Sequence, residues 1–367
     1  MIFKLSVAAL TGKYDKKDFS HLTKEDWESL YEMAVEQSIA ALTYKVAREY
    51  IVTFEELNKK WELISQQALV KELSFDAERS IILQKMEEAK IKYLPLKGII
   101  INKMYPQPGL RQFADNDILY AGADPKTLEK IMHELGYKTI LLSEYSNHDI
   151  YEKEPIYSFE MHKQLLPKKS SYHEYFLGAW DRAIRDENTK FGYHMSKEDF
   201  YVYFMAHMHK HYDINGTGIR SINDLYLIQK SMTDVDTDYI KEQLEIIGIK
   251  EFCKEMKDVC AYLFEGGELT ERVRENMKYI ASSATYGTKN HFVENRMKKS
   301  KNMFVYTLHR IFPPFKEVRT YFPIVGKWPI LLPFAWIYRY IRLIFVKERR
   351  ESFVMEIKKL KNKLLKK

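Results

Sequence analysis

The stretch that decides the fold reads Tyr93-Leu-Pro-Leu-Lys-Gly98, continues through Tyr105-Pro-Gln-Pro-Gly-Leu-Arg111, and ends at Asp115-Asn-Asp117-Ile-Leu-Tyr120. Its pattern predicts a short strand, a glycine turn, one helix, a loop and a second strand. Side chains two residues apart in a strand point to the same face, so Asp115 and Asp117 should project side by side. Two neighbouring carboxylates repel one another and are suited to a site where a divalent cation lies between them.

The dipeptide Lys97-Gly98 lies where the first strand ends and the helix is expected to begin. A helix N-terminus presents free N–H groups, which can bind a phosphate. A phosphate cradle and metal-binding carboxylates within one small unit indicate phosphoryl or nucleotidyl transfer.

Four elements of this stretch also carry a family resemblance, namely Leu96-Lys-Gly98, Tyr105-Pro106, Arg111 and Asp115-Asn-Asp117-Ile-Leu119. In this order and spacing they resemble the uncharacterised bacterial nucleotidyltransferase family of the DNA polymerase β-like superfamily. That superfamily has a glycine motif between strand and helix, Asp-x-Asp on the next strand and a third carboxylate on a later strand. The resemblance is strong over residues 94–120 and looser from 90 to 230, with an echo near 313–342.

The resemblance implies an α+β fold, in which a small mixed-sheet polymerase β-like core has helical regions on its N-terminal and C-terminal sides. We expect an N-terminal helical region (1–90), a nucleotidyltransferase core (91–170) and a helical domain (171–280). Residues 281–367 should form a linker, an aromatic helix and a basic tail.

The pattern of apolar residues predicts where the main elements of this fold lie. A long helix is expected over about 54–89, and a further helix includes 197–211. Strands are expected near 137–142, 148–152 and 156–162, and Gly136 fits the position that follows a helix C-terminus.

The strand over 156–162 places Ser158, Glu160 and His162 on one face. The superfamily pattern requires its third carboxylate here, so we assign that position to Glu160. The resemblance then implies that Asp115, Asp117 and Glu160 are catalytic and bind Mg²⁺ (or Mn²⁺). The implied reaction moves a nucleoside monophosphate from an NTP to an acceptor hydroxyl and releases pyrophosphate.

Further residues are predicted to bind the nucleotide or to lie near it. Lys97 would supply a point charge to the phosphates or lie in solvent at the strand end, and Gly98 would allow close backbone approach. Arg111 would bind phosphate or hold the Asp loop by an ion pair. The remaining residues of this set are His162, His207, His211 and Asp224.

The histidines of the 197–211 helix admit a second interpretation. His207 and His211 are four residues apart and share a helix face, as in two-histidine metal helices, and Asp224 would add a carboxylate. This set would make a zinc-dependent hydrolase. However, no Glu follows His207 as a hydrolytic base, and His209 points elsewhere, so a pocket-lining or structural role is preferred.

The net charge of +7 lies almost entirely at the C-terminal end. Lys347–Lys367 carries nine Lys/Arg against three Glu, which leaves about +1 for the rest of the chain. The body therefore lacks the basic footprint of a nucleic-acid binder, and no specific nucleic acid is predicted as a partner. The aromatic stretch 328–346 is interrupted by charges and prolines, so a transmembrane segment is not expected.

Residues 328–367 leave three interpretations open: a buried aromatic helix, an interfacial helix on an anionic membrane surface, and a surface that docks a partner. Cys253 and Cys260 are two helical turns, about 10 Å, apart, too far for a disulfide, so free thiols and a cytoplasmic location are predicted. The inner face of the membrane is the alternative location. A catalytically silent nucleotide- or membrane-associated module in cell-envelope or polysaccharide assembly is the alternative function.

Overall fold

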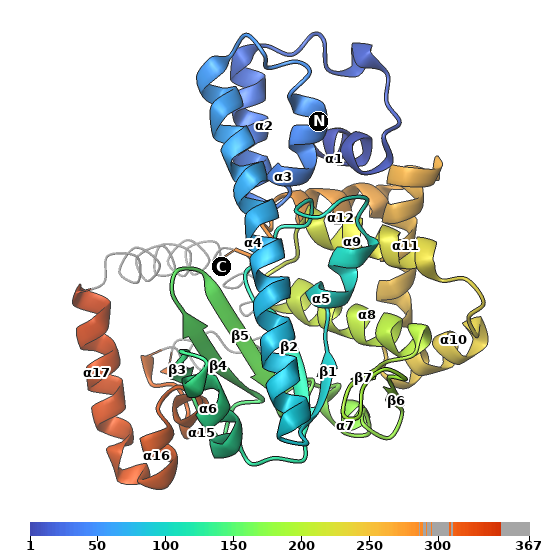
Figure 1. Cartoon of the computed structure of the whole chain (residues 1–367). Coiled ribbons are helices and arrows are strands. Elements are labelled where there is room, and N and C mark those ends of the chain that lie inside the picture. The colour runs from blue at the N-terminus through green and yellow to red at the C-terminus, as the bar shows by residue number, and fades with distance from the viewer. Residues whose placement is uncertain (286, 289–290, 292–294, 296–307, 310, 346–367) are drawn as a thin grey trace.

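The computed structural model describes residues 1–285, 287–288, 291, 295, 308–309 and 311–345. A five-stranded mixed sheet lies between helices that precede it and helices that follow it (Figure 1). The fold is therefore α+β with helical regions on both sides of the sheet core, as predicted.

The elements follow the expected order along the chain. The N-terminal helices are α1 (Ile2–Thr11), α2 (Lys24–Glu36), α3 (Ala40–Ala47) and α4 (Glu55–Glu88). The sheet core contains β1 (Lys92–Pro95), α5 (Gly98–Ile101), β2 (Asn116–Ala121), α6 (Pro125–Glu134), β3 (Lys138–Leu141), β4 (His148–Lys153) and β5 (Tyr157–His162). It is followed by α7 (His173–Leu177), β6 (Ile184–Arg185), β7 (Tyr193–His194), α8 (Lys197–Ile214), α9 (Ile219–Ser231), α10 (Thr237–Ile246), α11 (Lys250–Glu265) and α12 (Glu271–Ala281). The last described elements are α15 (Phe315–Tyr321), α16 (Pro323–Lys327), a single 3₁₀ turn (Pro329–Leu331) and α17 (Leu332–Phe345).

The strand order in the sheet is β1-β2-β5-β4-β3. The central pair, β2 and β5, is parallel, and the other neighbouring strands are antiparallel. The parallel pair needs a long crossover, which α6 and the β3–β4 hairpin provide. As a result, the Asp-containing strand and the Glu-containing strand lie next to each other in the middle of the sheet.

Alternation along β2 and β5 separates an apolar face from a polar one. The apolar face carries Ile118, Tyr120, Phe159 and Met161, which pack in one hydrophobic cluster with residues of α4 and α6. The opposite face carries the polar side chains of the same two strands and lies toward the helices that follow the sheet (Figure 1). The apolar face of the sheet is thus packed in a hydrophobic cluster, whereas the opposite face presents the polar side chains.

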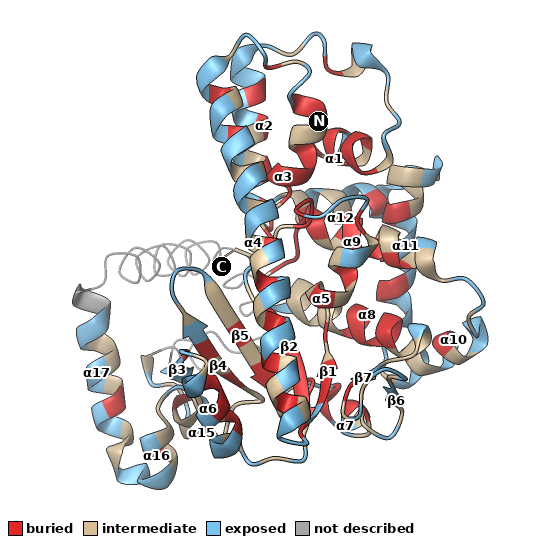
Figure 2. Cartoon of the chain, viewed as in Figure 1, coloured by how far each residue is buried: buried red, intermediate tan, exposed pale blue. Residues whose placement is uncertain are grey.

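The long helix α4 joins the two halves of the molecule. Its 34 residues correspond to about 50 Å of helix. Leu57 and Trp61 near its start belong to the helical core, whereas Phe75, Ile82 and Met86 pack under the sheet. The stripe of buried positions along α4 is visible in Figure 2.

The N-terminal helices and the helices after the sheet share one hydrophobic core. Trp27 and Leu42 from the first group belong to the same buried cluster as Tyr203 and Ile222 from the second. Within that core, Ser6 Oγ and the side chain of Asn223 exchange hydrogen bonds of 2.8 and 3.1 Å. The first and third predicted regions are therefore packed together in one core. The domain boundaries near residues 90, 170 and 280 stay predictions.

Gly109 supports the loop before β2 through an unusually close contact with α4. It has φ +82°, and a Cβ atom there would lie 2.7 Å from Leu69 Cα. Its N–H also donates to Glu72 Oε2 at 2.7 Å. Gly109→Ala is therefore expected to lower the free energy of unfolding by about 1–3 kcal/mol more than Gly12→Ala. Both substitutions place a Cβ atom on a residue with positive φ, but only the one at Gly109 also makes that atom overlap with the backbone of α4.

Gly12 is a suitable control because it has φ +70° and because a Cβ atom added there would meet nothing within 4 Å. Urea denaturation of the two variants measures the difference. Equal destabilisation by the two substitutions would contradict the close approach of the loop to α4.

Two further expectations concern the C-terminal half. Cys253 and Cys260 are free and buried in α11, as predicted. No helix within the described residues combines the length and hydropathy that crossing a bilayer requires. Most of the expected 282–302 linker, and all of the basic tail Lys347–Lys367, lie outside the described residues.

Candidate active site

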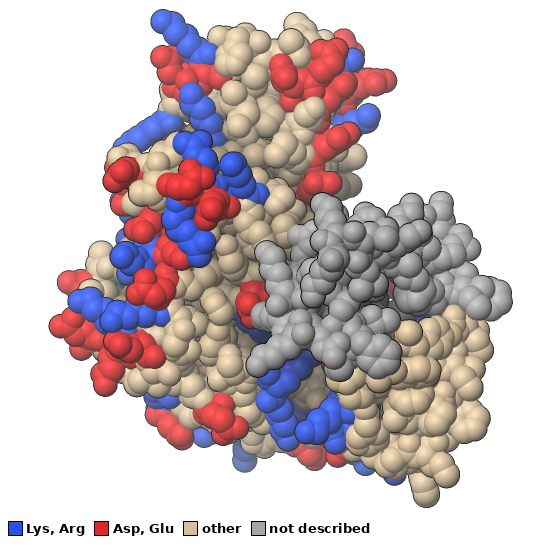
Figure 3. Space-filling model, turned by 180° about the vertical axis from the view of Figure 1, so that it is seen from behind, with Lys and Arg blue, Asp and Glu red and all other residues tan. Residues whose placement is uncertain are grey.

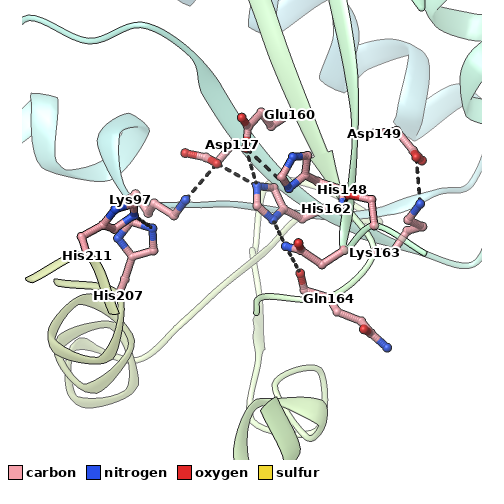
Figure 4. Close-up of polar contacts among 12 residues, drawn as sticks. Lys97, Asp117, His148, Asp149, Glu160, His162, Lys163, Gln164, His207 and His211 are labelled. Atoms are coloured by element: carbon pink, nitrogen blue, oxygen red, sulfur yellow. Dashed lines mark hydrogen bonds and ion pairs between the residues drawn. The ribbon is translucent and has the colours of Figure 1, made fainter. Parts of the chain in front are cut away.

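The site is built on the polar face of the two central strands. In the parallel register of β2 and β5, Asp117 lies directly opposite Glu160. Both side chains therefore project from the same face of the sheet, as Figure 4 shows. His162 follows two residues after Glu160 on that face, and it is buried.

Asp117 is held by two cationic or hydrogen-bonding partners. Lys97 Nζ lies 3.0 Å and His162 Nε2 lies 2.7 Å from the same oxygen, Asp117 Oδ1 (Figure 4). Burial opposes ionisation of this carboxyl, but the Lys97 charge and the His162 hydrogen bond hold the pKa of Asp117 well below its usual range. Asp117 is therefore an ionised carboxylate in a fixed orientation.

Lys97 lies at the turn between β1 and α5, with a positive φ of 39°. Burial lowers the stability of its charged form, yet the negative charge of Asp117 raises the pKa of Lys97 above its usual value. The sequence left open whether this lysine faces phosphate or solvent. It contacts Asp117, so in this structure its role is that of a counter-ion.

His162 connects the two acids on the neighbouring strands. Its Nε2 atom, 2.7 Å from Asp117 Oδ1, is also 3.4 Å from Glu160 Oε2. Although burial disfavours the imidazolium, the hydrogen bonds to Asp117 and Glu160 raise the pKa of His162. Burial alone would raise the pKa of the Glu160 carboxyl, but the hydrogen bond with His162 outweighs this effect, and the pKa is lowered.

Asp115 lies immediately before β2, at the edge of this group, and is partly accessible to solvent. Burial and the negative charges of Asp117 and Glu160 raise its pKa to about 6. No hydrogen bond to its carboxylate is formed by the described residues. It is thus a half-buried acid that two other acids repel, which is the electrostatic situation that a bound cation relieves.

Arg111 binds the carboxylate of Asp224 on α9. Its Nε and Nη2 atoms donate to Asp224 Oδ1 and Oδ2, each at 2.9 Å, in a buried bidentate pair. Tyr105 Oη donates to the same Asp224 Oδ1 at 2.9 Å. Of the two roles that the sequence left open for Arg111, this geometry favours holding the Asp loop, here against helix α9.

Gly98 leaves room for this arginine. A Cβ atom at Gly98 would lie 2.9 Å from Arg111 Nη1, and Arg111 Nη1 also donates to Asn102 Oδ1 at 3.1 Å. The glycine therefore allows the guanidinium group to pass beneath the start of α5. This is a different physical reason from the close approach to phosphate that the sequence suggested.

His207 and His211 lie on α8, and their Nε2 atoms are 3.2 Å apart. Burial lowers the pKa of both imidazoles. The positive charge of Lys97 lowers the pKa of His207 further, and that of Lys210 lowers the pKa of His211, which falls to about 3. Both imidazoles are therefore neutral at pH 7.

The zinc arrangement considered from the sequence is not formed. Both oxygens of Asp224 are taken by Arg111, so this carboxylate does not join the histidine pair. The metal-ligating side chains that do converge within the described part of the chain are His148, Glu160 and His162.

Two residues of this region were missed from the sequence. His148 lies opposite His162 in the antiparallel register of β4 and β5. Folding the two predicted strands into a hairpin centred on Pro155 would have revealed that pair. The second is Lys210, which lies between His209 and His211 on α8. Burial and the charge of Lys97 lower its pKa to about 8. The residues next to it in the sequence did not indicate that it lies near the site.

Comparison with known proteins adds an independent observation. The profile of a family described as "Uncharacterised nucleotidyltransferase" matches residues 23–265, well over half of the chain. A search of curated proteins finds no match.

Two solved structures are similar to parts of the chain. The solution structure of the antibiotic-resistance factor ANT(2'')-Ia has 11% identity and a TM-score of 0.35, covering 52% of this chain and 97% of its own. A nucleotidyltransferase-like protein from Paracoccidioides brasiliensis has 12% identity and a TM-score of 0.34, covering 54% and 96%. The family match confirms the resemblance carried by the Lys-Gly, Arg and Asp-x-Asp elements. The chain belongs to the uncharacterised nucleotidyltransferase family.

Proposed function

We propose that this protein is a Mg²⁺-dependent enzyme that transfers a nucleoside monophosphate from an NTP to an acceptor hydroxyl and releases pyrophosphate. Family membership supports nucleotidyl transfer as the reaction type. The observation that carries the finer proposal is the register of Asp117 opposite Glu160, with the half-buried Asp115 directly before the same strand.

The residues present fit a divalent cation. Asp115 and Asp117 supply the hard oxygen ligands that Mg²⁺ and Mn²⁺ accept, and Glu160 adds a third carboxylate on the same face. Burial and, after it, the negative charges of Asp117 and Glu160 raise the pKa of Asp115, and a cation would relieve the repulsion among these charges. When bound, the metal would neutralise phosphate charge and make the acceptor hydroxyl more acidic.

The remaining residues have positioning and binding roles in this proposal. Lys97 and His162 fix the orientation of Asp117 by contacts of 3.0 and 2.7 Å. Lys210 contributes positive charge toward the triphosphate, and the neutral His207 and His211 line the nucleotide or acceptor pocket from α8. Arg111 and Asp224 act indirectly, because their buried pair fixes the loop that presents Asp115.

Calorimetry with a non-hydrolysable NTP, with and without Mg²⁺, tests the proposal. Wild-type protein is expected to bind the nucleotide in a Mg²⁺-dependent way, and Asp115→Asn is expected to lose that dependence. Glu152→Gln is the matched control, because Glu152 is an exposed acid on β4. A Mg²⁺ effect of equal size in wild type and Asp115→Asn would contradict the assignment.

The catalytically silent module remains the competing proposal for the same fold. It predicts nucleotide binding without pyrophosphate release from any hydrolysable NTP in the presence of cell extract. Release of pyrophosphate that is lost in Asp115→Asn rejects the silent module. Binding without release in the wild type rejects the enzyme.

A peripheral contact with an anionic membrane is a second, separate proposal, supported by the surface of α16 and α17. Residues 318–345 contain four cations and no acid. The side of the molecule where α16 and α17 lie shows few charged side chains in Figure 3. Large apolar side chains are exposed along this segment, with Ile330 at 79% and Phe334 at 65%. Apolar and aromatic groups accompanied by Lys/Arg suit the interface of an anionic bilayer.

Vesicle sedimentation tests this second proposal. The protein is expected to bind vesicles that contain phosphatidylserine and to bind neutral vesicles more weakly. Ile330→Ser/Phe334→Ser should weaken binding at least about tenfold, because burying each side chain is worth about 1.5–3 kcal/mol. Ile246→Ser is the control, since Ile246 is exposed on a different helix. Equal binding of the double variant and the wild type would reject the membrane contact.

A further inference from the structure

The pairing of β4 with β5 brings two histidines and one acid together on the polar face of the sheet. His148 lies opposite His162, and their ring centroids are 5.0 Å apart. Glu160, two residues before His162, projects from the same strand face, and its carboxylate lies beside both rings (Figure 4). Three potential ligands therefore come from two rigid strands.

The distances place these ligand atoms around one point. Glu160 Oε2 is 3.7 Å from His148 Nδ1 and 3.4 Å from His162 Nε2. All three ligand atoms lie within 4.8 Å of one another. In a tetrahedral zinc site with bonds of about 2.0–2.1 Å, neighbouring ligand atoms are roughly 3.3–3.4 Å apart. Two of the three separations are therefore close to those of a metal site.

His148 supplies an independent reason to expect a ligand. Its Nδ1 atom is buried and has no hydrogen-bond partner among the described residues. A buried polar atom without a partner is uncommon, because the loss of hydration is not compensated. The atom faces Glu160 at 3.7 Å, which is beyond hydrogen-bond distance. A metal ion at this point would satisfy the lone pair of Nδ1.

We propose that His148, Glu160 and His162 form a site for a divalent transition-metal ion of the Mn²⁺, Co²⁺ or Zn²⁺ type. Two imidazole nitrogens and one carboxylate favour these ions over Mg²⁺, which prefers oxygen ligands.

In the ion-free arrangement, His162 Nε2–H donates to Asp117. On metal binding the lone pair of that nitrogen goes to the ion, and the proton is released to solvent. The other ring nitrogen, Nδ1, then keeps its proton, and the side chain of Asn147, whose amide lies 3.5 Å away, would have to turn its Oδ1 toward Nδ1 to accept from it.

This inference deepens the proposed function, because Glu160 would then belong to a second cation position with nitrogen ligands. The Asp115 position would take Mg²⁺ with the nucleotide, whereas the His148 position would take the transition metal. The two assignments can fail separately. Metal binding at His148 is measured without nucleotide, and Mg²⁺-dependent nucleotide binding is measured without a transition metal.

The test uses full-length protein that has been treated with chelator and then titrated with Co²⁺ or Mn²⁺. Co²⁺ reports nitrogen ligation and low coordination number through its visible absorption. Pulsed EPR of bound Mn²⁺ detects coupling to the ¹⁴N nuclei of imidazole ligands. We expect one ion per chain at this site, affinities in the order Zn²⁺ above Co²⁺ above Mn²⁺, and no displacement by equimolar Mg²⁺.

His148→Ala is the decisive variant, because His148 is partly exposed and its loss should not prevent folding. Removing a direct ligand should weaken Co²⁺ binding at least about tenfold, since loss of even an outer partner of a ligand typically costs that much. His21→Ala is the control, because His21 is exposed near the N-terminus. Unchanged Co²⁺ affinity in His148→Ala, or a Mn²⁺ spectrum without ¹⁴N coupling, would overturn the proposal.

Discussion

Replacement of Asp115 by Asn is expected to abolish nucleotidyl transfer while leaving the folded state at least as stable as the wild type. The neutral side chain removes a charge that burial and the neighbouring Asp117 and Glu160 destabilise, the two effects that raise the Asp115 pKa to about 6. It also removes an oxygen ligand from the proposed cation site. Since a catalytic metal contributes several kcal/mol to the transition state, transfer should fall by about 10³-fold or more.

Transfer can be followed with an α-phosphate-labelled NTP and cell extract as the source of acceptor, and stability by urea denaturation. Asp117→Asn is a useful contrast, because it removes the counter-charge of the buried Lys97 and His162. That variant should lose both activity and stability. A fully active Asp115→Asn protein would show that the acid at this position does not bind a catalytic cation.

Arg111→Met is expected to destabilise the protein by about 3–5 kcal/mol, a large part of the stability of a typical domain. The Arg111–Asp224 pair is almost completely buried, with side-chain exposures of 7% and 4%. Removing the arginine leaves the Asp224 carboxylate with Tyr105 Oη as its remaining hydrogen-bond donor in this network. An uncompensated buried charge is the source of the expected loss.

The double variant Arg111→Met/Asp224→Asn should recover part of that stability, because the amide carries no charge and can still accept from Tyr105. Arg272→Met is the control, since Arg272 is exposed and its ion pair with the half-buried Glu255 is expected to contribute no more than about 1 kcal/mol. Urea denaturation of all three variants provides the comparison. A loss from Arg111→Met no greater than that from Arg272→Met would contradict the structural role of the buried pair.

Local patterns predicted much of the fold and the central acids. The long helix expected over about 54–89 is α4 (Glu55–Glu88), because its apolar spacing continues without a breaker. The strand expected over 156–162 is β5, and its alternation placed Glu160 and His162 on one face. Glu160 lies opposite Asp117 in the parallel register, and this agrees with the order of carboxylates that the family resemblance implied.

Contacts between distant parts of the chain could not be predicted in the same way. Arg111 and Asp224 are 113 residues apart, so their pairing depends on how α9 packs against the loop before β2. For the same reason, the sequence placed Lys97 beside phosphate or in solvent, whereas it contacts Asp117. His148 required the strand register of β4 and β5, which the individual strand patterns do not specify.

The interpretation of the histidines on α8 also depended on tertiary contacts. Helical spacing correctly placed His207 and His211 on one face of α8, with their Nε2 atoms 3.2 Å apart. Spacing could not show that Asp224 already pairs with Arg111, or that both rings lie near Lys97 and Lys210. The spacing of His207 and His211 therefore resembled a zinc site in the sequence, whereas in the structure the two residues form a neutral histidine pair.

Anomalous diffraction from crystals grown with Mn²⁺ and a non-hydrolysable NTP is the most direct test of the central claim. We predict a Mn²⁺ peak at bonding distance from the carboxylates of Asp115 and Asp117, with the nucleotide phosphates as further ligands. A bound nucleotide whose phosphates lie elsewhere, with no ion at Asp115 and Asp117, would contradict the proposed active site.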